Sequence, residues 1–449
     1  MTQIEESADV VVVGAGSAGV AAAVAAAEEG ARTVLIEASG HVGGTLAWQL
    51  LEHSAGFHDV HGTQVIAGFG ERLIARLREI GASPGHVRDD VGYTATRTPI
   101  NHAELGLMET VLLGEAGVSL WLNAPLVAVE REGARIGTLV IQTRAGRRQL
   151  HPRQVVDASG DAVVARRADA RFHGDAQGAR QPASLTFKLG GVDFAALLAY
   201  ARANPADFRP GSVIGDATSA HVNLWGFGRL LARGYQSGQL SLQRTELHLA
   251  GWPLRGEAVI NASRIAAGDE HDNWTGPAII ALSRQVLEFA RWFRETVPGC
   301  GEAYVAAVAD RIGVRESGRV VGRATLTRDD LLHPERRPDA VAQAAFPIDI
   351  HDPTRPGLSH AEQLCECYDI PYGCLVADGL DNLLLAGRCI SSTHEANGSV
   401  RITATCFATG EAAGVAAALA ARESVSAASL NVDGIREVLR RRGVLLRAA

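Results

Sequence analysis

The chain has 449 residues, 47% of them hydrophobic, and a formal net charge of -7. This length and composition indicate a large globular protein of two or three domains that can bury a sizeable core. The acidic balance lacks the electrostatic footprint of a nucleic-acid-binding protein. The alanine-rich runs 20–27 and 412–421 are too short for a membrane span of about 20 residues, so we expect neither nucleic acid nor a membrane as a partner.

The cysteine pattern and the first apolar run favour a cytoplasmic protein. That run has no basic segment before it and no cleavage site after it, so it lacks the pattern of a secretory signal. Six cysteines occur without the spacing of a disulfide framework, which favours reduced thiols. Cys365, Cys367 and Cys374 lack a second pair at matching spacing, so we predict no metal site there.

The first predicted element is a strand over residues 9–13 that runs into a glycine-rich turn and an alanine-rich helix. In the turn Gly14-Ala15-Gly16-Ser17-Ala18-Gly19, the first glycine makes the tight turn, the second admits a pyrophosphate and the third allows close helix packing. The positive end of the helix would hold the phosphates. A second strand over 33–36 ends at Glu37 and Ala38, where the carboxylate can bind ribose hydroxyls. Together these elements predict a dinucleotide site.

A second glycine-rich loop over residues 39–45 can pass beside the pyrophosphate, which places Gly43, Gly44 and Thr45 at the cofactor. Helices are predicted over about 70–80 and 103–116. The period then changes to two, and we expect strands over 119–123, 125–129, 135–143 and 147–149 in a β-meander packed on the nucleotide-binding sheet. Residues 154–161 close the meander with a buried strand and the small-residue turn Ala158-Ser159-Gly160.

From about residue 183 to 347, amphipathic helices and isolated strands indicate an inserted domain. Its clearest helix starts at Thr275 and stops before Pro298. Its apolar face, which we interpret as core, contains Ile279, Leu282, Val286, Phe289 and Phe293. Residues 381–387 then return to a buried-strand pattern, followed by a polar loop and a long helix from near Thr403. We predict an α/β fold: a Rossmann-like domain with a β-meander, built from residues 1–182 and 348–449, around an inserted α+β domain over 183–347.

Several separated strings resemble the FAD-dependent oxidoreductases of the fumarate reductase and succinate dehydrogenase flavoprotein superfamily. The closer likeness is to a bacterial family named simply FAD-dependent oxidoreductases. The strings are VVVGAGSAG at 11–19, GGT at 43–45, GFHDVHG at 56–62, ASGDA at 158–162, GVRES at 313–317, FPIDIHDP at 346–353, DIPYGCL at 369–375 and DNLLLAGRCISSTHEANGSVRI at 381–402. The resemblance implies FAD as the cofactor, with the flavin ring at the interface of the two domains.

The resemblance also assigns cofactor contacts. It implies that the first glycine loop holds the pyrophosphate, Glu37 the adenosine ribose and Gly43 to Thr45 the phosphate-to-ribityl stretch. It places the adenine against the backbone of Val127 and the cofactor channel along Ala158 to Gly160. Where many relatives have an acidic residue after the last strand, this chain has Gly387-Arg388, so we expect Arg388 to pair with the pyrophosphate. Val400, near the end of the last string, completes this predicted site.

The loop over residues 388–401 precedes a helix whose N-terminus would point at the N1/C2 edge of the flavin. There its dipole stabilises the anion of the reduced ring and eases hydride acceptance at N5. We expect His394 and Glu395 to handle the proton. The fork of Arg315 or Arg401 would hold a substrate carboxylate; ion pairs of these arginines with Glu316 or Asp349 are the alternative.

Other side chains in or near these strings are further candidates for the site. Arg315 and Glu316 are adjacent and should face different neighbours. His58 is a candidate substrate contact. With His53 and His61 it forms a histidine group, but no helix-spaced carboxylate accompanies them, so we predict no metal. Tyr368 and Tyr372 could cover the flavin edge, although packing is the simpler interpretation.

We therefore predict an enzyme that transfers hydride between flavin N5 and a small organic substrate, as dehydrogenase or reductase, with an unidentified electron acceptor or donor. A disulfide reductase would need a second glycine fingerprint and a cysteine pair after Gly44, which the chain lacks. A flavin monooxygenase should have Gly-Asp where Gly387-Arg388 stands. A non-catalytic electron-transfer subunit stays open, because the three cysteines at 365, 367 and 374 could contact an iron–sulfur partner. No pattern indicates or excludes a homo-oligomer.

Overall fold

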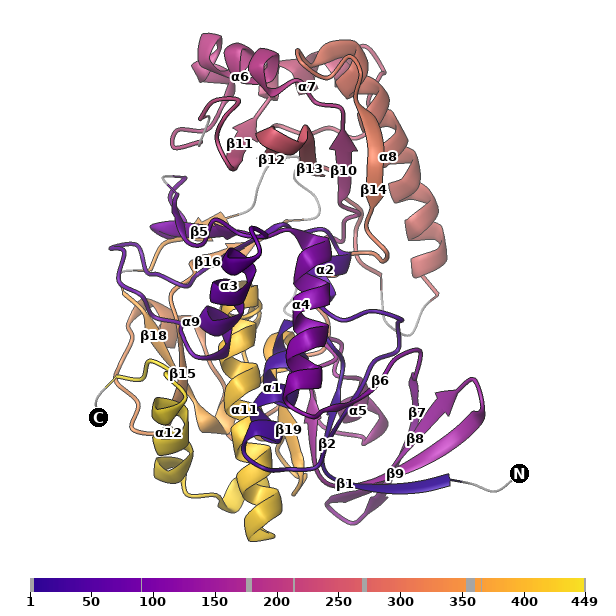
Figure 1. Cartoon of the computed structure of the whole chain (residues 1–449), viewed down its shortest axis with the longest axis vertical. Helices are drawn as coiled ribbons and strands as arrows, with labels where there is room; N and C mark the ends of the chain where they lie inside the picture. Colours follow the sequence, from indigo (N-terminus) through magenta and orange to yellow (C-terminus); the bar gives the residue numbers. More distant parts are fainter. Residues whose placement is uncertain are drawn as a thin grey trace.

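Two hydrophobic cores divide the chain into a larger and a smaller body (Figure 1). The computed structural model describes residues 4–89, 91–174, 180–212, 215–268, 273–352, 360–364 and 366–447. The larger body holds both ends of the described chain. The smaller body, at the top of Figure 1, comes from the middle of the sequence.

The larger body is built on a seven-stranded sheet in the order β6-β2-β1-β9-β8-β7, with β19 paired to the end of β9. The mutually parallel strands are β1 (Ile4–Val13), β2 (Thr33–Ile36), β6 (Ser119–Trp121), β9 (Gly146–Asp157) and β19 (Leu383–Leu385); β7 (Leu126–Glu132) and β8 (Arg135–Thr143) form an antiparallel extension. Val10 to Val12 are fully buried, as expected for a parallel strand covered on both faces. Because β19 comes from the last quarter of the chain, the predicted assembly from both chain ends is confirmed.

The meander region differs from the prediction in three ways. β6 pairs with β2 at the edge of the main sheet and is not part of the meander. The strands predicted at 147–149 and 154–157 are one twelve-residue strand, β9. The meander is hydrogen-bonded into the main sheet through β1 and does not pack on it. Period-two patterning located the strands, but it does not reveal partners that are distant in sequence.

Helices α1 (Ser17–Glu28) and α11 (Thr403–Glu423) pack backbone to backbone. A Cβ atom on Gly410 would lie 2.1 Å from the carbonyl oxygen of Ala18, and one on Gly414 would lie 2.1 Å from that of Ala22. Among the described helices, α11 alone is long and apolar enough to cross a membrane, and its apolar window is wholly buried inside the protein. The prediction that both alanine-rich runs are buried helices is confirmed.

The remaining elements of the larger body surround this layer. Its other helices are α2 (Gly44–Trp48), α3 (Phe69–Glu79), α4 (His102–Glu115), α5 (Val163–Arg167), α9 (Arg328–Leu332), α10 (His394–Val400) and α12 (Val432–Arg441). Its small sheets contain β3 (His53–Ala55), β4 (Val87–Arg88) and β5 (Thr96–Pro99), then β15 (Ala340–Ala344) with β18 (Tyr368–Pro371), and β16 (Ile348–Ile350) with β17 (His360–Glu362). Helix α10 lies within the segment 388–401 that was expected to be a loop.

The smaller body is a five-stranded antiparallel sheet in the order β11-β12-β13-β10-β14. The strands are β10 (Phe187–Gly190), β11 (Val222–Gly226), β12 (Leu247–Trp252), β13 (Glu257–Asn261) and β14 (Tyr304–Val308), and the helices are α6 (Phe194–Ala203), α7 (Gly228–Gln236) and α8 (Thr275–Thr296). Leu224, Leu249 and Ile260 pack into its core. Their neighbours Trp225 and His248 point the other way, toward the larger body, because side chains alternate along a strand.

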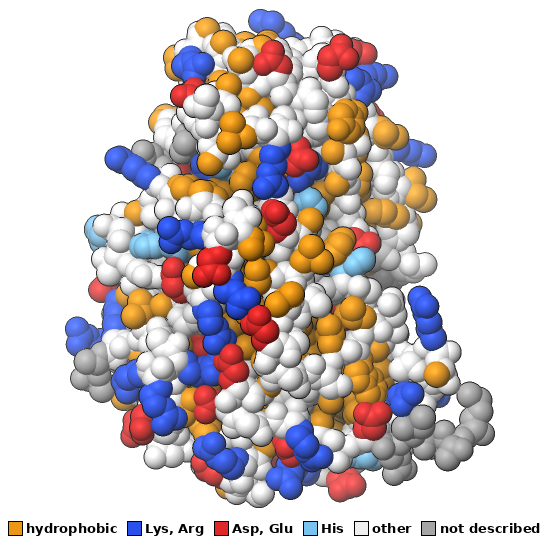
Figure 2. Space-filling model, viewed as in Figure 1, with side chains coloured by type: hydrophobic (Ala, Val, Ile, Leu, Met, Phe, Trp, Pro, Cys, Tyr) orange, Lys and Arg blue, Asp and Glu red, His pale blue; other side chains and the backbone are white. Residues whose placement is uncertain are grey.

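The residues of the two cores can be compared with the predicted domain bounds and with the predicted apolar face of α8. The smaller core takes residues between Leu185 and Ala309, together with Leu50. Residues 320–345 of the predicted inserted segment pack in the larger core. Helix α8 begins at Thr275 as predicted, but Ile279 of its predicted apolar face is 37% exposed. On the surface seen in Figure 2, basic and acidic side chains are intermixed.

Candidate active site

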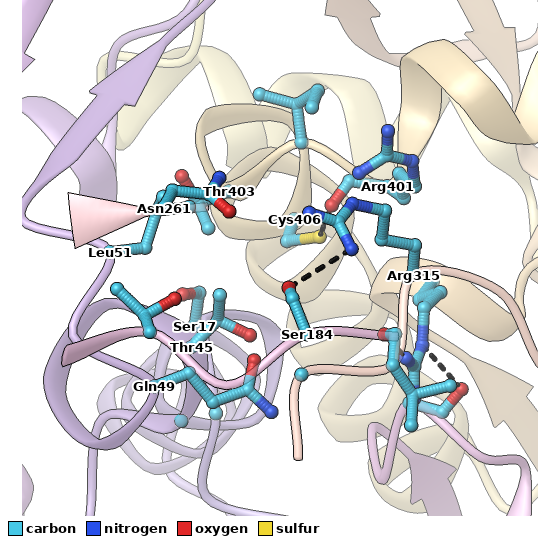
Figure 3. A pocket seen from close by; sticks show the side chains of 18 of the residues that line it. Ser17, Thr45, Gln49, Leu51, Ser184, Asn261, Arg315, Arg401, Thr403 and Cys406 are labelled. Atoms are coloured by element: carbon cyan, nitrogen blue, oxygen red, sulfur yellow. Dashed lines mark hydrogen bonds between the residues drawn. The ribbon is translucent and has the colours of Figure 1, made fainter. Parts of the chain in front are cut away.

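A cavity lies between the two bodies and extends along the glycine-rich loops. Its volume is about 360 Å³, which lies within the roughly 300–1,000 Å³ of typical ligand pockets. Figure 3 shows Ser17, Thr45 and Gln49 on one side of it, with Arg315 and Arg401 on the other.

The first glycine loop forms one end of the cavity. Helix α1 begins at Ser17 after Gly16, and no side chain caps its first N–H groups, so these donors are left for a ligand. A Cβ atom on Gly19 would lie 1.7 Å from the carbonyl oxygen of Gly14, and one on Gly14 would lie 2.7 Å from Cα of Ser159. Only glycine permits this approach of the loop to helix α1 and to the turn after β9.

Glu37 joins the first glycine loop to the loop after β2, beside this helix end. Its Oε2 accepts a hydrogen bond from Ala15 N at 2.8 Å, and its Oε1 accepts one from Ser39 N at 2.8 Å. The Gly43 N–H donates to the carbonyl oxygen of Ala15 at 2.8 Å. The uncapped helix, the glycine cradle and this carboxylate on the cavity wall fit the pyrophosphate and ribose of FAD.

The turn after β9 is held by a buried carboxylate. Asp157 accepts hydrogen bonds from Ser159 N, Val164 N and Ala165 N at 2.8–3.2 Å. Beside this turn, Arg388 donates to Gly160 O at 3.1 Å and to the Asp161 carboxylate. Arg388 therefore lines the cavity with its charge offset by Asp161, and its pairing with the pyrophosphate stays a prediction.

Four arginines line the half of the cavity that faces the smaller body: Arg244, Arg264, Arg315 and Arg401. Arg315 donates to Pro182 O at 2.7 Å and to Ser184 Oγ at 3.1 Å, the second bond being visible in Figure 3. Arg401 donates to Asp349 Oδ2 at 3.3 Å. Nε and Nη1 of Arg244 and Nε of Arg401 are buried without a hydrogen-bond partner.

Several positive charges are buried close together in this half. Burial, with repulsion from the other arginines, lowers the pKa of Arg315 to about 9 and that of Arg244 to about 10. Burial alone would raise the pKa of Asp349, but His351, Arg401 and Arg315 hold it well below its usual range. The other wall carboxylates here are already paired, Glu246 with Arg209 at 2.6 Å and Asp89 with Arg97 at 3.6 Å. The arginines therefore favour a ligand with negative charge.

A series of five rings, which we call the ring wall, lines the same half: His53, His248, Trp225, Tyr93 and Phe346. The ring centroids of Trp225 and His248 are 4.2 Å apart and stacked, and those of Tyr93 and Phe346 are 5.6 Å apart and stacked. Tyr93 and Trp225 join these pairs at 6.2 Å, and His53 meets His248 edge-on at 4.9 Å. Burial lowers the pKa of His53 to about 4, and its Nδ1 has no hydrogen-bond partner.

The predicted site residues are divided by this geometry. Those on the cavity wall are Gly14, Gly16, Ser17, Ala18, Glu37, Gly44, Thr45, Ala158, Ser159, Gly160, Gly387, Arg388 and Arg315. The predicted residues that are described but do not form the wall are Ala15, Gly19, Ala38, Gly43, Val127, Val400, His58, His394 and Glu395. Val127 is 38% exposed on β7, away from the cavity.

The residues predicted to handle the proton or contact the substrate, His394, Glu395 and His58, are not on the cavity wall. His394 lies behind the wall, with Nδ1 2.7 Å from Glu316 Oε1, and Nδ1 of His58 is 2.9 Å from Thr96 Oγ1. The structure brings neither of them into contact with the cavity. Arg315 and Glu316 do face different neighbours, as their adjacency predicted.

Sequence reasoning missed Arg244, Arg264 and the role of the ring wall, of which it singled out His53 alone, as part of a histidine group. Most of these residues come from the smaller sheet or lie next to it, so their convergence depends on strand pairing. One local signal was available: Val222-Asn223-Leu224-Trp225 alternates buried apolar residues with residues of the opposite face. This pattern would have indicated a strand with a functional face.

Other sequence features have structural roles. Tyr368 OH is 2.6 Å from Ser399 Oγ and Tyr372 OH donates to Ala427 O at 2.8 Å, so both tyrosines pack inside the larger body. Cys367 and Cys374 are buried, and Cys365 lies outside the described residues. In the part of the chain that the structure describes, no group of three or more His, Cys, Asp or Glu side chains could hold a metal ion.

A Rossmann-like sheet whose first helix opens onto a cavity, with a second sheet as the opposite wall, is the architecture of two-body dinucleotide-binding flavoproteins. The family model of FAD-dependent oxidoreductases matches residues 9–439, and the chain belongs to that family. The predictions of an FAD cofactor and of an enzyme are therefore confirmed. The finer resemblance to the fumarate reductase flavoproteins is not.

Solved structures share the fold at low sequence identity. The p-nitrophenol 4-monooxygenase of Pseudomonas putida is 11% identical with a TM-score of 0.50, over 98% of this chain and 85% of that one. A geranylgeranyl bacteriochlorophyll reductase-like protein of Thermoplasma acidophilum is 13% identical with a TM-score of 0.46, over 98% and 93%. The likeness to the monooxygenase establishes the fold alone. No curated protein matches the chain.

Proposed function

We propose that this enzyme transfers hydride between FAD and a small carboxylate-bearing substrate, as a dehydrogenase or a reductase. The observation that carries the proposal is the excess of arginine in the cavity. Four guanidinium groups line one half of it, and Asp349 on the same wall pairs with Arg401. A carboxylate would accept hydrogen bonds from their planar forks and offset their charge.

Helix α11 places its N-terminus at the same wall. It begins at Thr403 after Ile402, without a side-chain cap, and Ile402, Thr403 and Cys406 line the cavity. Its positive end would stabilise negative charge on a reduced ring. When bound, FAD supplies the two-electron chemistry, in which a hydride moves between a substrate carbon and N5 while the neighbouring O–H or N–H loses or gains a proton.

We assign the proton to His53 in place of His394. His53 lies on the ring wall and is neutral at pH 7, because its pKa is about 4. A neutral imidazole can accept a proton at a nitrogen that has no partner. His351 is less suited, because Asp349 lies 3.1 Å from its Nε2 and Arg264 3.5 Å from its Nδ1.

Anaerobic reduction of the bound flavin tests the proposal. The holoenzyme is mixed with hydroxy acids, amino acids, amines, sugars and enoates, and bleaching of the flavin is followed. We expect bleaching by a carboxylate-bearing compound, and Arg244→Gln should raise the concentration needed by about tenfold or more, as expected for a lost charge-assisted hydrogen bond. Arg284→Gln, an exposed change on α8, should leave it unchanged. Bleaching by uncharged compounds alone would contradict the proposal.

The same preparation tests the proton assignment. His53→Gln should slow bleaching and alter its pH profile, whereas His394→Gln should leave the profile unchanged, because His394 does not reach the cavity. If His394→Gln alone alters the profile, the proton is handled from behind the wall. Adding a quinone or O2 afterwards shows which acceptor reoxidises the flavin.

A further inference from the structure

The geometry points to an aromatic carboxylate as the substrate, with its ring against the ring wall and its carboxylate at Arg244 and Arg264. This inference rests on the proposed function and adds the substrate class to it. The two halves of the argument come from separate groups of side chains on one cavity surface.

The ring wall is assembled from both bodies. Trp225 and His248 are direct partners on β11 and β12, so their rings lie side by side on the sheet face that looks into the cavity. Tyr93 and Phe346 belong to the larger body, and Tyr93 contacts both Phe346 and Trp225. Aromatic pairs prefer stacked or edge-on geometries, so such a wall selects a flat ring over a flexible chain.

The wall is also held rigidly. Nε2 of His248 lies 2.6 Å from Asn223 Oδ1, and the Arg209 guanidinium sits 5.1 Å from the centre of the Trp225 ring. Arg209 donates to Tyr93 OH at 3.4 Å and to Glu246 at 2.6 Å. Because these contacts fix the rings before a ligand arrives, little entropy is lost when a planar molecule binds.

The pairing of β12 with β13 brings together the two arginines that would bind the carboxylate. Arg244 precedes β12 and Arg264 follows β13, and these strands are antiparallel neighbours, so both arginines lie at the same edge of the smaller sheet. Nε and Nη1 of Arg244 are buried donors without a partner, and the side chain is 8% exposed. Unsatisfied buried donors and a buried charge are costly, and Arg244 lines the cavity, so an anionic ligand group beside its guanidinium would offset part of that cost.

Each half excludes a different substrate class. A neutral aromatic compound would leave the Arg244 donors unsatisfied, and a cation would be repelled. A short aliphatic acid would satisfy Arg244 but leave the ring wall, which includes Trp225 and Tyr93, without a matching surface. An aromatic carboxylate satisfies both groups at once.

Calorimetric titration of the holoenzyme tests this with benzoate, benzamide, cyclohexanecarboxylate, succinate and phenyl phosphate. We expect benzoate to bind about tenfold or more tightly than benzamide, from the charge-assisted hydrogen bonds. It should bind a few-fold more tightly than cyclohexanecarboxylate, from aromatic contacts. Arg244→Gln should remove the first preference and Trp225→Leu the second, while Arg284→Gln keeps both.

Several results would overturn the inference. If benzoate and benzamide bind with equal affinity, Arg244 and Arg264 do not form an anion site. If cyclohexanecarboxylate or succinate binds as tightly as benzoate or more tightly, the ring wall does not bind an aromatic ring. Tighter binding of phenyl phosphate assigns a phosphate in place of the carboxylate. Bleaching by an aliphatic acid without any benzoate binding rejects the aromatic class and leaves the proposed function intact. Benzoate binding with the expected preferences, but no bleaching by any carboxylate, rejects the proposed function instead.

Discussion

Arg244 should destabilise the ligand-free enzyme, and its removal should therefore raise the melting temperature. Burial, with repulsion from Arg264, lowers its pKa from 12.5 to about 10. At about 1.36 kcal/mol per pKa unit, the fold loses about 3 kcal/mol by holding this charge. Because the pKa of this base is lower in the fold than in the unfolded chain, the full cost applies below about pH 10 and fades only between about pH 10 and 12.5.

Replacement with methionine keeps most of the side-chain stem and removes the charge. Arg244→Met should raise the stability of the ligand-free enzyme by about 1–3 kcal/mol, the lower value allowing for the smaller side chain. With an unfolding entropy of about 2.1 cal/mol/K per residue over 449 residues, this is a rise of about 1–3 °C in Tm. Differential scanning calorimetry at pH 7 measures it, and Arg284→Met on the exposed side of α8 should move Tm by less than about half a degree.

A bound ligand should stabilise the parent more than the Arg244→Met variant. Benzoate at saturating concentration stabilises whatever form binds it, so it should raise the Tm of the parent more than that of Arg244→Met. A variant that melts below the parent without ligand would refute the reasoning. It would show that the Arg244 guanidinium is satisfied within the protein and that no ligand is needed to offset it.

Three further changes test other parts of the structure. Gly19→Ala places a Cβ atom 1.7 Å from a carbonyl oxygen of the first glycine loop, so the purified variant should lose most of its flavin absorbance. In the control Gly114→Ala, the new Cβ atom meets nothing within 4 Å, and the flavin absorbance should stay unchanged. Burial raises the pKa of Glu109 to about 8, so near neutral pH this carboxyl is protonated in the fold but ionised in the unfolded chain. The free energy of unfolding of the parent, measured in urea, should therefore fall by up to about 4 kcal/mol between pH 5 and 8. Glu109→Gln should remove this pH dependence. Lys188, the only lysine of the chain, is buried 2.7 Å from Glu52 between the two bodies, so Lys188→Met should cost about 3–5 kcal/mol in the same assay.

The nucleotide end of the site could be predicted from sequence because its physics is local. Gly14 has φ of +99°, and Gly19 meets a carbonyl only five residues earlier, so the turn itself demands glycine at fixed spacing. Glu37 follows a four-residue buried strand whose neighbour is β1. A strand, a glycine turn and a helix in one short stretch leave few other arrangements.

The structure differs from the sequence prediction where segments far apart in the chain pack together. The apolar run at β6 gives no sign that its partner is β2, more than eighty residues earlier in the chain. His394 looked like a catalytic residue because it follows the last strand of the nucleotide domain. In the fold, Nδ1 of His394 contacts the carboxylate of Glu316, and His394 is not on the cavity wall. A histidine is catalytic only where its nitrogen reaches the reacting atoms, and that depends on tertiary packing.

The smaller sheet shows how the substrate half could be approached from sequence in related chains. A sheet whose helices all pack on one face must cover its other face with something else. Here Leu224 and Leu249 turn toward the helices, while Trp225 and His248 turn toward the cavity. Trp225 and His248 line the cavity between the two bodies, where a ligand can contact them. Their alternation with a buried apolar set therefore indicates a binding surface, and the residue types on it indicate what is bound.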